Sequence, residues 1–204
     1  MKSKLKQCLL LTAIMILGFL PIGLAQSNYE IISSKDNNMK LPGTSTFHDW
    51  DMNTENLNGT AQFVFKGKNN DQLSHIKSLS FSLLVQDLKS GQSGLDDNAY
   101  KALNSEEYKE IVFKLIYAKV STTNNNKYLV KTVGNLIIAG VTQKVTMDVY
   151  CVINSNGTIT SSGTYKLKMT DYNVKPPSFM LGVMKTGDDI TLNFSMTYEK
   201  KPEI

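Results

Sequence analysis

The sequence contains no arginine, so all 22 of its basic residues are lysines. Arginine supplies the planar, bidentate donor pairs that grip phosphate and carboxylate groups, and lysine replaces them only as a point charge. The formal net charge is only +4, which is little for the many phosphate contacts of a nucleic-acid interface. We therefore do not expect a nucleic-acid partner.

Cysteine and histidine are also scarce, since the chain has only Cys8, Cys151, His48 and His75. Cys8 lies in a segment that we expect to be removed, which leaves Cys151 without a partner for an internal disulfide. Its position in an alternating segment predicts a small buried side chain rather than a catalytic thiolate. The two histidines lack the spacing of zinc ligands. We expect neither a metal nor another resident cofactor.

The longest apolar run, Leu9–Leu20, follows three lysines within the first six residues. Small residues up to Ala25 then supply a signal-peptidase site. The run is about a dozen residues, whereas a helix needs about 20 to cross a bilayer. Residues 1–25 are therefore predicted to be a cleaved signal peptide, with a retained membrane anchor as the alternative. Cleavage near Ala25 predicts a periplasmic or secreted protein without a stable membrane anchor.

Residues 26–204 are expected to form one domain, because no linker, charge block or repeat divides them. Apolar and polar residues alternate most clearly from Val145 to Ile153, which is typical of a strand with one dry face. Turns are expected at Gly140–Thr142 and at Asn156-Gly157. The predicted strands cover residues 29–33, 44–51, 60–65, 79–85, 111–120, 127–133, 136–139, 145–153, 158–169 and 190–198.

One stretch, residues 96–110, lacks this alternation. It contains helix formers together with Asn, Asp and Ser residues that can cap a helix, so it predicts a short helical insertion. Many short antiparallel strands with one helix indicate an all-β sandwich or barrel. Of the two, a barrel is the favoured interpretation.

Five segments also occur in a recognisable order: GTSTFHDW (43–50), the strand and loop from residue 81 that lead into DDNAYKAL (96–103), EIVFKL (110–115), GNLIIAGVTQKVTMDV (134–149) and PSFMLGVMKTGDDITLNF (177–194). Together they resemble the YceI-like family of exported, polyisoprenoid-binding proteins, in the bacterial branch with HDW and FMLGVMKTGD motifs. The resemblance implies an eight-stranded antiparallel, lipocalin-like barrel. It implies further that the apolar interior holds an isoprenoid chain such as a quinone tail. A homodimer is also among the assemblies that it implies.

An eight-stranded barrel is the size at which side chains either fill the interior or leave room for one small ligand. Residues 176–189 begin with two prolines and are unusually apolar, so they are expected to plug one end or to line an entrance. The same apolar side chains could instead pack as a dry core. The candidate ligand-binding residues are Phe63, Phe65, Phe81, Leu83, Phe113, Leu115, Tyr117, Met147, Val149, Leu167, Met169, Phe194 and, in the proline-led segment, Phe179, Met180, Leu181 and Met184.

The leading hypothesis is an exported, non-enzymatic binding protein for an isoprenoid lipid or quinone. The alternative is an exported stress-response or interaction protein with a filled barrel, which binds another protein through its loops. A third hypothesis, a hydrolase or isomerase acting on a lipid, needs a titratable pair inside the barrel. The alternation places only Tyr117, Tyr165 and Cys151 there, and Ser45 with His48 lacks a nucleophile elbow. An enzyme is therefore not expected.

Overall fold

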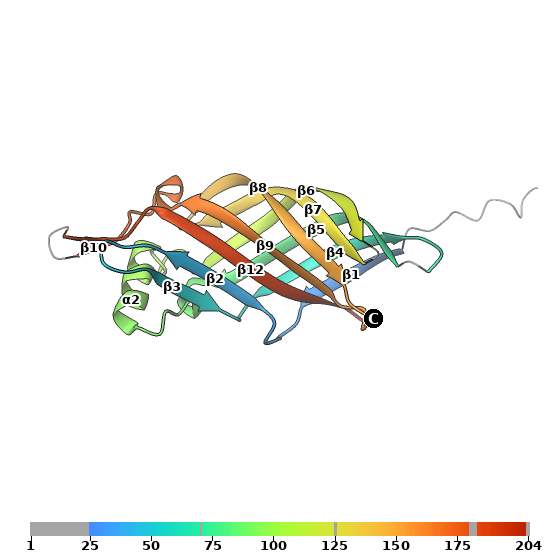
Figure 1. Cartoon of the computed structure of the whole chain (residues 1–204), viewed down its shortest axis with the longest axis horizontal. Coiled ribbons are helices and arrows are strands. Elements are labelled where there is room, and N and C mark those ends of the chain that lie inside the picture. The colour runs from blue at the N-terminus through green and yellow to red at the C-terminus, as the bar shows by residue number, and fades with distance from the viewer. Residues whose placement is uncertain (1–24, 70, 125, 180–182, 203–204) are drawn as a thin grey trace, which may run out of the picture.

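The structure, a computed structural model, describes residues 25–69, 71–124, 126–179 and 183–202. The predicted signal peptide therefore lies outside the described residues, except for Ala25. An elongated barrel of tilted antiparallel strands dominates the molecule (Figure 1). Its ring consists of β1 (Ala25–Ile31), β4 (Asn58–Lys66), β5 (Gln72–Leu84), β6 (Glu110–Asn124), β7 (Lys127–Ile138), β8 (Val141–Ile153), β9 (Ile159–Lys168) and β12 (Asp189–Lys200).

Each strand of this ring pairs with the next in that order, and β1 closes the ring by pairing with β12. Every pairing is antiparallel. The prediction of an all-β, eight-stranded, lipocalin-like antiparallel barrel is thus confirmed. Closure gives every strand of the ring a neighbour on both sides, although β5–β6 and β8–β9 pair over only part of their length.

A hairpin of β2 (Asn38–Gly43) and β3 (Trp50–Thr54) extends the wall at one end of the barrel (Figure 1). Along the same edge of β12, β1 pairs with residues 198–200 and β2 with residues 193–195. The chain between β1 and β2 is held by Asn37, which is only 1 % exposed. The Asn37 Nδ2 donates to the Ile32 carbonyl at 2.7 Å, and the Thr197 amide donates to the Asn37 Oδ1 at 2.9 Å. The Asn37 side chain thus bonds to the backbone of β12 between the segments of β12 that pair with β1 and with β2.

The helical insertion covers the same end of the barrel. After the short 3₁₀ turn η1 (Val85–Asp87), the chain bonds to β3 through two 2.9 Å backbone hydrogen bonds between Asn53 and Lys89. It then forms α2 (Ser93–Ala102). Asp96, although only 8 % exposed, accepts hydrogen bonds from the amide and the hydroxyl of Ser90, which fix the start of the helix.

The predicted helix at residues 96–110 is therefore correct in type but too long. Asn104 has a φ of 49°, in the left-handed region where a helix ends. Residues 103–109 form turns that lead into β6. The helix begins at Ser93, earlier than predicted, so Asp96 lies inside the helix.

The tight turns fall close to their predicted positions. β7 and β8 are joined at Ala139-Gly140, whose φ values of 47° and 76° are those of a type I′ hairpin. The turn therefore precedes the predicted Gly140–Thr142 position, and β8 already begins at Val141. Gly157 has a φ of 82°, and its amide donates to the Asn154 carbonyl in the β8–β9 connection. The predicted hairpin at this point is confirmed.

Two strand predictions are wrong near the helical end of the barrel. Residues 44–49 form a loop instead of a strand, and β3 begins only at Trp50. The loop is tied to a distant segment, since the Thr46 amide donates to the Lys185 carbonyl at 3.0 Å. The strand β2 was missed because Pro42 interrupts its alternation. By contrast, residues 127–133 and 136–139 form one strand, β7, because Gly134 continues the ladder between them.

The prediction that Tyr117 faces the interior is also wrong, because its side chain is 56 % exposed. In the β6–β7 ladder, Leu115 pairs with Gly134 and Tyr117 pairs with Val133, so Ile116 is an extra residue. Such a β-bulge shifts the alternation by one position. Inward and outward residues exchange beyond it, and Tyr117 turns to the outer surface.

At the end of the barrel opposite α2, β1 meets the C-terminal half of β12 (Figure 1). Aromatic rings pack together in this region. The Phe63 ring makes edge-to-face contacts with Tyr29 at 5.1 Å and with Tyr198 at 5.7 Å. Phe63 and Tyr198 have no exposed surface. Edge-to-face pairs of this kind add stability beyond their buried area. This half of the interior is a core.

Candidate functional site

The end of the barrel that carries α2 contains a cavity of about 310 Å³. Sites that enclose drug-sized ligands have volumes of roughly 300–1,000 Å³, so the cavity is large enough for one small molecule. The ring strands, the β2–β3 hairpin and α2 all contribute to it. Its apolar lining consists of Met39, Leu41, Trp50, Met52, Phe81, Leu83, Leu88, Leu95, Ala99, Ala102, Leu103, Ile111, Leu136, Ile138, Leu167, Met169, Tyr172, Val174, Pro177, Ile190 and Leu192.

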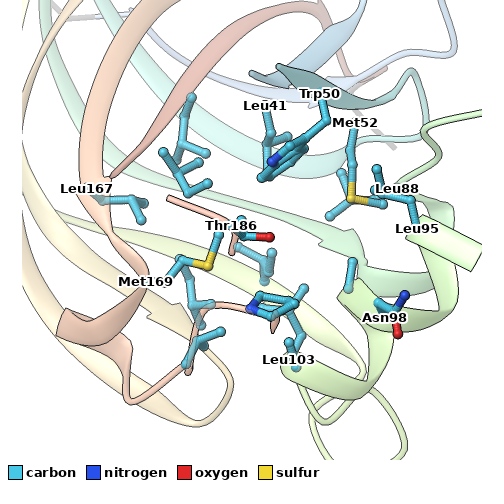
Figure 2. Close-up of a pocket in the computed structure, with 18 of the residues that line it drawn as sticks. Leu41, Trp50, Met52, Leu88, Leu95, Asn98, Leu103, Leu167, Met169 and Thr186 are labelled. Atoms are coloured by element: carbon cyan, nitrogen blue, oxygen red, sulfur yellow. The ribbon is translucent and has the colours of Figure 1, made fainter. Parts of the chain in front are cut away.

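Figure 2 shows how elements distant in the sequence surround the cavity. Leu167 and Met169 lie on one side, and Leu88 and Leu95 lie on the opposite side near the helix. Met39 and Leu41 alternate toward the cavity from β2, whereas Leu95, Ala99 and Ala102 recur at helical spacing along α2. Helix and hairpin thus complete a wall that the ring alone leaves open.

The inner boundary of the cavity depends on a stacked pair of rings. Phe81, which lines the cavity, stacks on Phe113 with ring centroids 5.8 Å apart. Phe113 itself is 2 % exposed and does not line the cavity. Its ring lies directly over Gly134 of the neighbouring strand, where a Cβ atom would come within 2.5 Å of the Phe113 Cε2. Glycine at position 134 therefore leaves the space that this ring occupies.

Polar side chains gather at the mouth of the cavity, contributed by Ser45, His48, Gln92, Asn98, Lys185 and Thr186. Figure 2 shows Thr186 among the apolar side chains and Asn98 beside the helix at the edge of the cavity. Trp50 also lines the cavity, and its Nε1 donates to the Thr44 carbonyl at 3.0 Å. Among the described residues that line the cavity there is no carboxylate. The arrangement is an apolar chamber with a neutral to cationic rim.

The structure brings only part of the predicted set together at this cavity. Phe81, Leu83, Leu167 and Met169 line it. Seven other predicted residues are buried or half-buried within the barrel but do not line it, namely Phe63, Phe65, Phe113, Leu115, Met147, Val149 and Phe194. Alternation along a strand tells which face a residue occupies, but not how far along the barrel axis the open space extends.

The predicted residues of the proline-led segment lie at the mouth or outside the described chain. Phe179 and Met184 pair in a short hairpin formed by β10 (Ser178–Phe179) and β11 (Met184–Lys185). Met180 and Leu181 lie outside the described residues. Lys185 of this hairpin lines the cavity together with Pro177 and Thr186, which flank the hairpin. The segment thus contributes to the entrance.

The prediction of ligand-binding residues missed the contributions of α2 and of Tyr172 in the turn after β9. The spacing of Leu95, Ala99 and Ala102 could have indicated one helix face directed at the barrel. No comparable signal exists for Tyr172, which ends the 3₁₀ turn η2 (Met169–Tyr172). Its position depends on how that turn folds back over the barrel.

Two titratable side chains of the described barrel interior, Cys151 and Tyr172, have raised pKa values. Burial raises the pKa of the Cys151 thiol to about 11, although Ser161 hydrogen-bonds with it at 3.3 Å. Burial also raises the pKa of Tyr172 well above its usual value, and the neighbouring Tyr165 and Asp171 raise it further. Desolvation is the physical cause in both cases, because it disfavours the charged form.

The described residues were also compared with the arrangements that a hydrolase uses, namely an activated serine, an accessible cysteine or a metal cluster. The Ser45 hydroxyl donates to the backbone carbonyl of His48 at 2.6 Å, so the pair does not form a nucleophile and base. Cys151 is 1 % exposed and does not line the cavity. Within the same residues no cluster of three His, Cys, Asp or Glu side chains could hold a metal ion. No helix in the described ranges is both long and apolar enough to cross a bilayer.

A closed antiparallel barrel with an apolar chamber at one end defines the lipocalin-like class of fold. Within that class, the chain belongs to the YceI-like domain family, whose family model matches residues 36–198. The family resemblance that the five sequence segments indicate is therefore confirmed.

Two solved structures with the same fold come from bacteria. The chain is similar to BcnA of Burkholderia cenocepacia, with a TM-score of 0.63 and 16 % identity over 82 % of this chain and 98 % of that one. It is also similar to a polyisoprenoid binding domain from Saccharophagus degradans that is implicated in plant cell wall breakdown. There the TM-score is 0.62 and the identity 12 %, over 88 % of this chain and all of the other. No curated protein matches the chain.

Proposed function

We propose that this protein is an exported, non-enzymatic binding protein that holds an apolar chain, such as an isoprenoid lipid or a quinone tail, inside the barrel. The observation that carries the proposal is the chamber of about 310 Å³, which has an apolar lining and a polar mouth. The family supports it, and the Saccharophagus degradans relative is named as a polyisoprenoid binding domain.

The apolar chamber supplies affinity without specific polar contacts. Each methylene group that leaves water contributes roughly 0.8 kcal/mol, so a few isoprene units are enough for substantial binding. Methionines such as Met39, Met52 and Met169 add adaptable surface for a flexible guest. The packed aromatic end of the barrel limits how deep the guest can enter, so we expect the chain to lie between the mouth and the Phe81–Phe113 pair.

A role in transport or storage fits the chemistry of the described residues better than catalysis. The thiol of Cys151 is protonated and lies away from the chamber, and Ser45 hydrogen-bonds to backbone rather than to a base. Export rests on the N-terminal sequence, with its lysines, apolar run and small residues up to Ala25. The proposed location is the periplasm or the medium.

The single tryptophan of the chain, Trp50, lines the chamber and offers a direct assay. Titration of a quinone with a two-isoprene tail should quench its fluorescence saturably. Ala99→Phe on the chamber face of α2 should weaken that binding at least tenfold, because the added ring occupies the guest's space. The matched control Lys101→Phe, on the exposed side of the same helix, should bind normally. Saturable quenching that Ala99→Phe leaves unchanged would refute this location of the site, and the absence of quenching would refute the function.

A further inference from the structure

Three neighbouring strands of the barrel wall, β6, β7 and β8, are rich in lysine and poor in acidic residues (Figure 1). Their acidic residues are Glu110, at the beginning of β6, and Asp148. Their lysines are all exposed, namely Lys114, Lys119, Lys127, Lys131 and Lys144. The outer surface of these three strands, called the β6–β8 face below, is therefore cationic.

The strand register places these lysines next to one another. Lys119 pairs with Lys131 across the β6–β7 ladder. Lys114 and Lys144 lie on either side of Asn135, with which both pair. Like charges directly opposite each other in a sheet are destabilising. The pairing of Lys119 with Lys131 therefore does not contribute to folding, which favours a role outside the fold.

Most of this positive charge is not neutralised within the protein. Lys131 has one acidic neighbour, Asp148, at 4.0 Å, and the other four lysines of the face form no ion pair with a described residue. Across the barrel, by contrast, the Lys201 Nζ lies 2.6 Å from the Glu30 Oε2 of β1. The β6–β8 face thus retains positive charge that a partner can neutralise.

The same face exposes apolar side chains among its lysines. The bulge in β6 leaves Ile116 and Tyr117 exposed by 52 % and 56 %, and Tyr150 of β8 is 57 % exposed. The described chain exposes six large apolar side chains, so half of them lie on these three strands. Tyrosine has an amphipathic ring and is enriched where a membrane meets water.

A bilayer with anionic headgroups fits this combination better than another protein does. Protein interfaces are depleted in lysine and use arginine for their ion pairs, and this chain has no arginine. Lysines near an anionic membrane, however, are attracted to it without any fixed pairing geometry. The tyrosines beside them suit the headgroup region.

We infer that the β6–β8 face docks the protein reversibly, on its side, on a membrane surface that contains anionic lipids. The lysines neutralise lipid phosphates, and Tyr117 and Tyr150 enter the headgroup region. This inference goes beyond the proposed function, because docking does not require a guest in the chamber. A carrier docked in this way stays at the membrane, where isoprenoid lipids reside.

Co-sedimentation of the mature protein with sucrose-loaded vesicles tests the docking. Vesicles with equal amounts of phosphatidylglycerol and phosphatidylcholine should bind the protein at low salt and release it at high salt, because salt screens the attraction. Vesicles of phosphatidylcholine alone should not bind it. Lys119→Gln combined with Lys144→Gln should weaken binding about 25-fold, since each lysine near an anionic surface contributes roughly fivefold.

The matched control removes the same charge from the other side of the barrel. Lys35→Gln, in the loop after β1, is combined with Lys66→Gln, at the end of β4, and both positions are exposed. The ring order places β1 and β4 across the barrel from β7 and β8. This control should therefore lose much less affinity than the variant of the β6–β8 face.

A bimane label reports which side of the barrel meets the membrane. Thr146→Cys places the label on the β6–β8 face, and Thr60→Cys places it at an exposed position of β4. The native Cys151 is 1 % exposed and should not compete for the label. With anionic vesicles, the emission of the label at position 146 should shift to shorter wavelength, and that of the label at position 60 should not.

Three results would overturn the inference: no binding to anionic vesicles, equal binding to both kinds of vesicle, or equal losses in the two lysine variants. Capture by poly-glutamate without binding to vesicles would assign the face to an acidic protein instead, and would also overturn it. None of these results depends on the chamber, so the proposed function would still be decided by the quinone titration.

Discussion

Replacement of Gly134 by alanine tests whether the rings at the inner boundary of the chamber are packed as the structure shows. The new Cβ would lie 2.5 Å from the Phe113 Cε2 and 2.7 Å from the carbonyl oxygen of Lys114. Carbon atoms do not approach so closely, so something must move. The carbonyl belongs to the β6–β7 ladder and cannot yield easily, which leaves the Phe113 ring to be displaced toward Phe81.

Overpacking of a filled site costs about 1–3 kcal/mol. For a domain of this size each kcal/mol lowers the melting temperature by roughly 2–4 °C, so we expect a fall of about 2–12 °C. Because Phe81 lines the chamber, the same substitution should also weaken quenching of Trp50 by the bound quinone.

Thermal and urea unfolding followed by circular dichroism measure the effect. Gly94→Ala is the matched control, since nothing lies within 4 Å of its Cβ position and alanine suits a helix better than glycine. It should leave stability unchanged or slightly higher. Combination of Gly134→Ala with Phe113→Leu should cost less than the sum of the two single changes, because the smaller side chain removes the clash. Wild-type stability of Gly134→Ala, or simple additivity in the double variant, would refute the packing.

Three further predictions concern the described wall and core. Asn37→Ala leaves the buried amide of Thr197 without its acceptor, so urea unfolding should show a loss of about 1–3 kcal/mol, and unchanged stability would contradict the bridging role. Cys151, with its raised pKa of about 11, should react with iodoacetamide at pH 8 only after unfolding, as peptide mass mapping can show. Rapid labelling of the native protein would disprove its burial. Hydrogen bonds from Thr170 lower the pKa of Asp188, so its contribution to stability exists above the pKa of the unfolded state and is lost as the pH falls through the folded value. A carbon NMR titration of the native protein that finds an ordinary pKa for Asp188 would exclude this effect.

The sequence contained enough information for the barrel. The alternation from Val145 to Ile153 and the Asn156-Gly157 turn predicted β8 and its hairpin, because strand period and turn chemistry are local properties. The fold also depends on features, such as β-bulges, that the alternation of apolar and polar residues does not reveal. The extra residue Ile116 shifts the alternation within β6, and nothing in its neighbours' hydrophobicity marks the shift. The orientation of Tyr117 was predicted incorrectly for this reason.

The chamber was only partly predictable for a different reason. Phe81 and Leu83 were found because they face inward from a regular strand. Their partners on α2 and on the β2–β3 hairpin come from segments that close the mouth through long-range contacts, such as the Asn53–Lys89 bridge. Tyr172 depends on a turn held by Asp188, far along the chain. Tertiary contacts of this kind have no local sequence signature.

Native mass spectrometry of the mature protein from its own host, before and after extraction with organic solvent, tests the binding function most directly. The account predicts one discrete apolar adduct that extraction removes and that is missing from Ala99→Phe but present in Lys101→Phe. A protein that carries no adduct and takes up no added isoprenoid quinone or ketone would contradict the account.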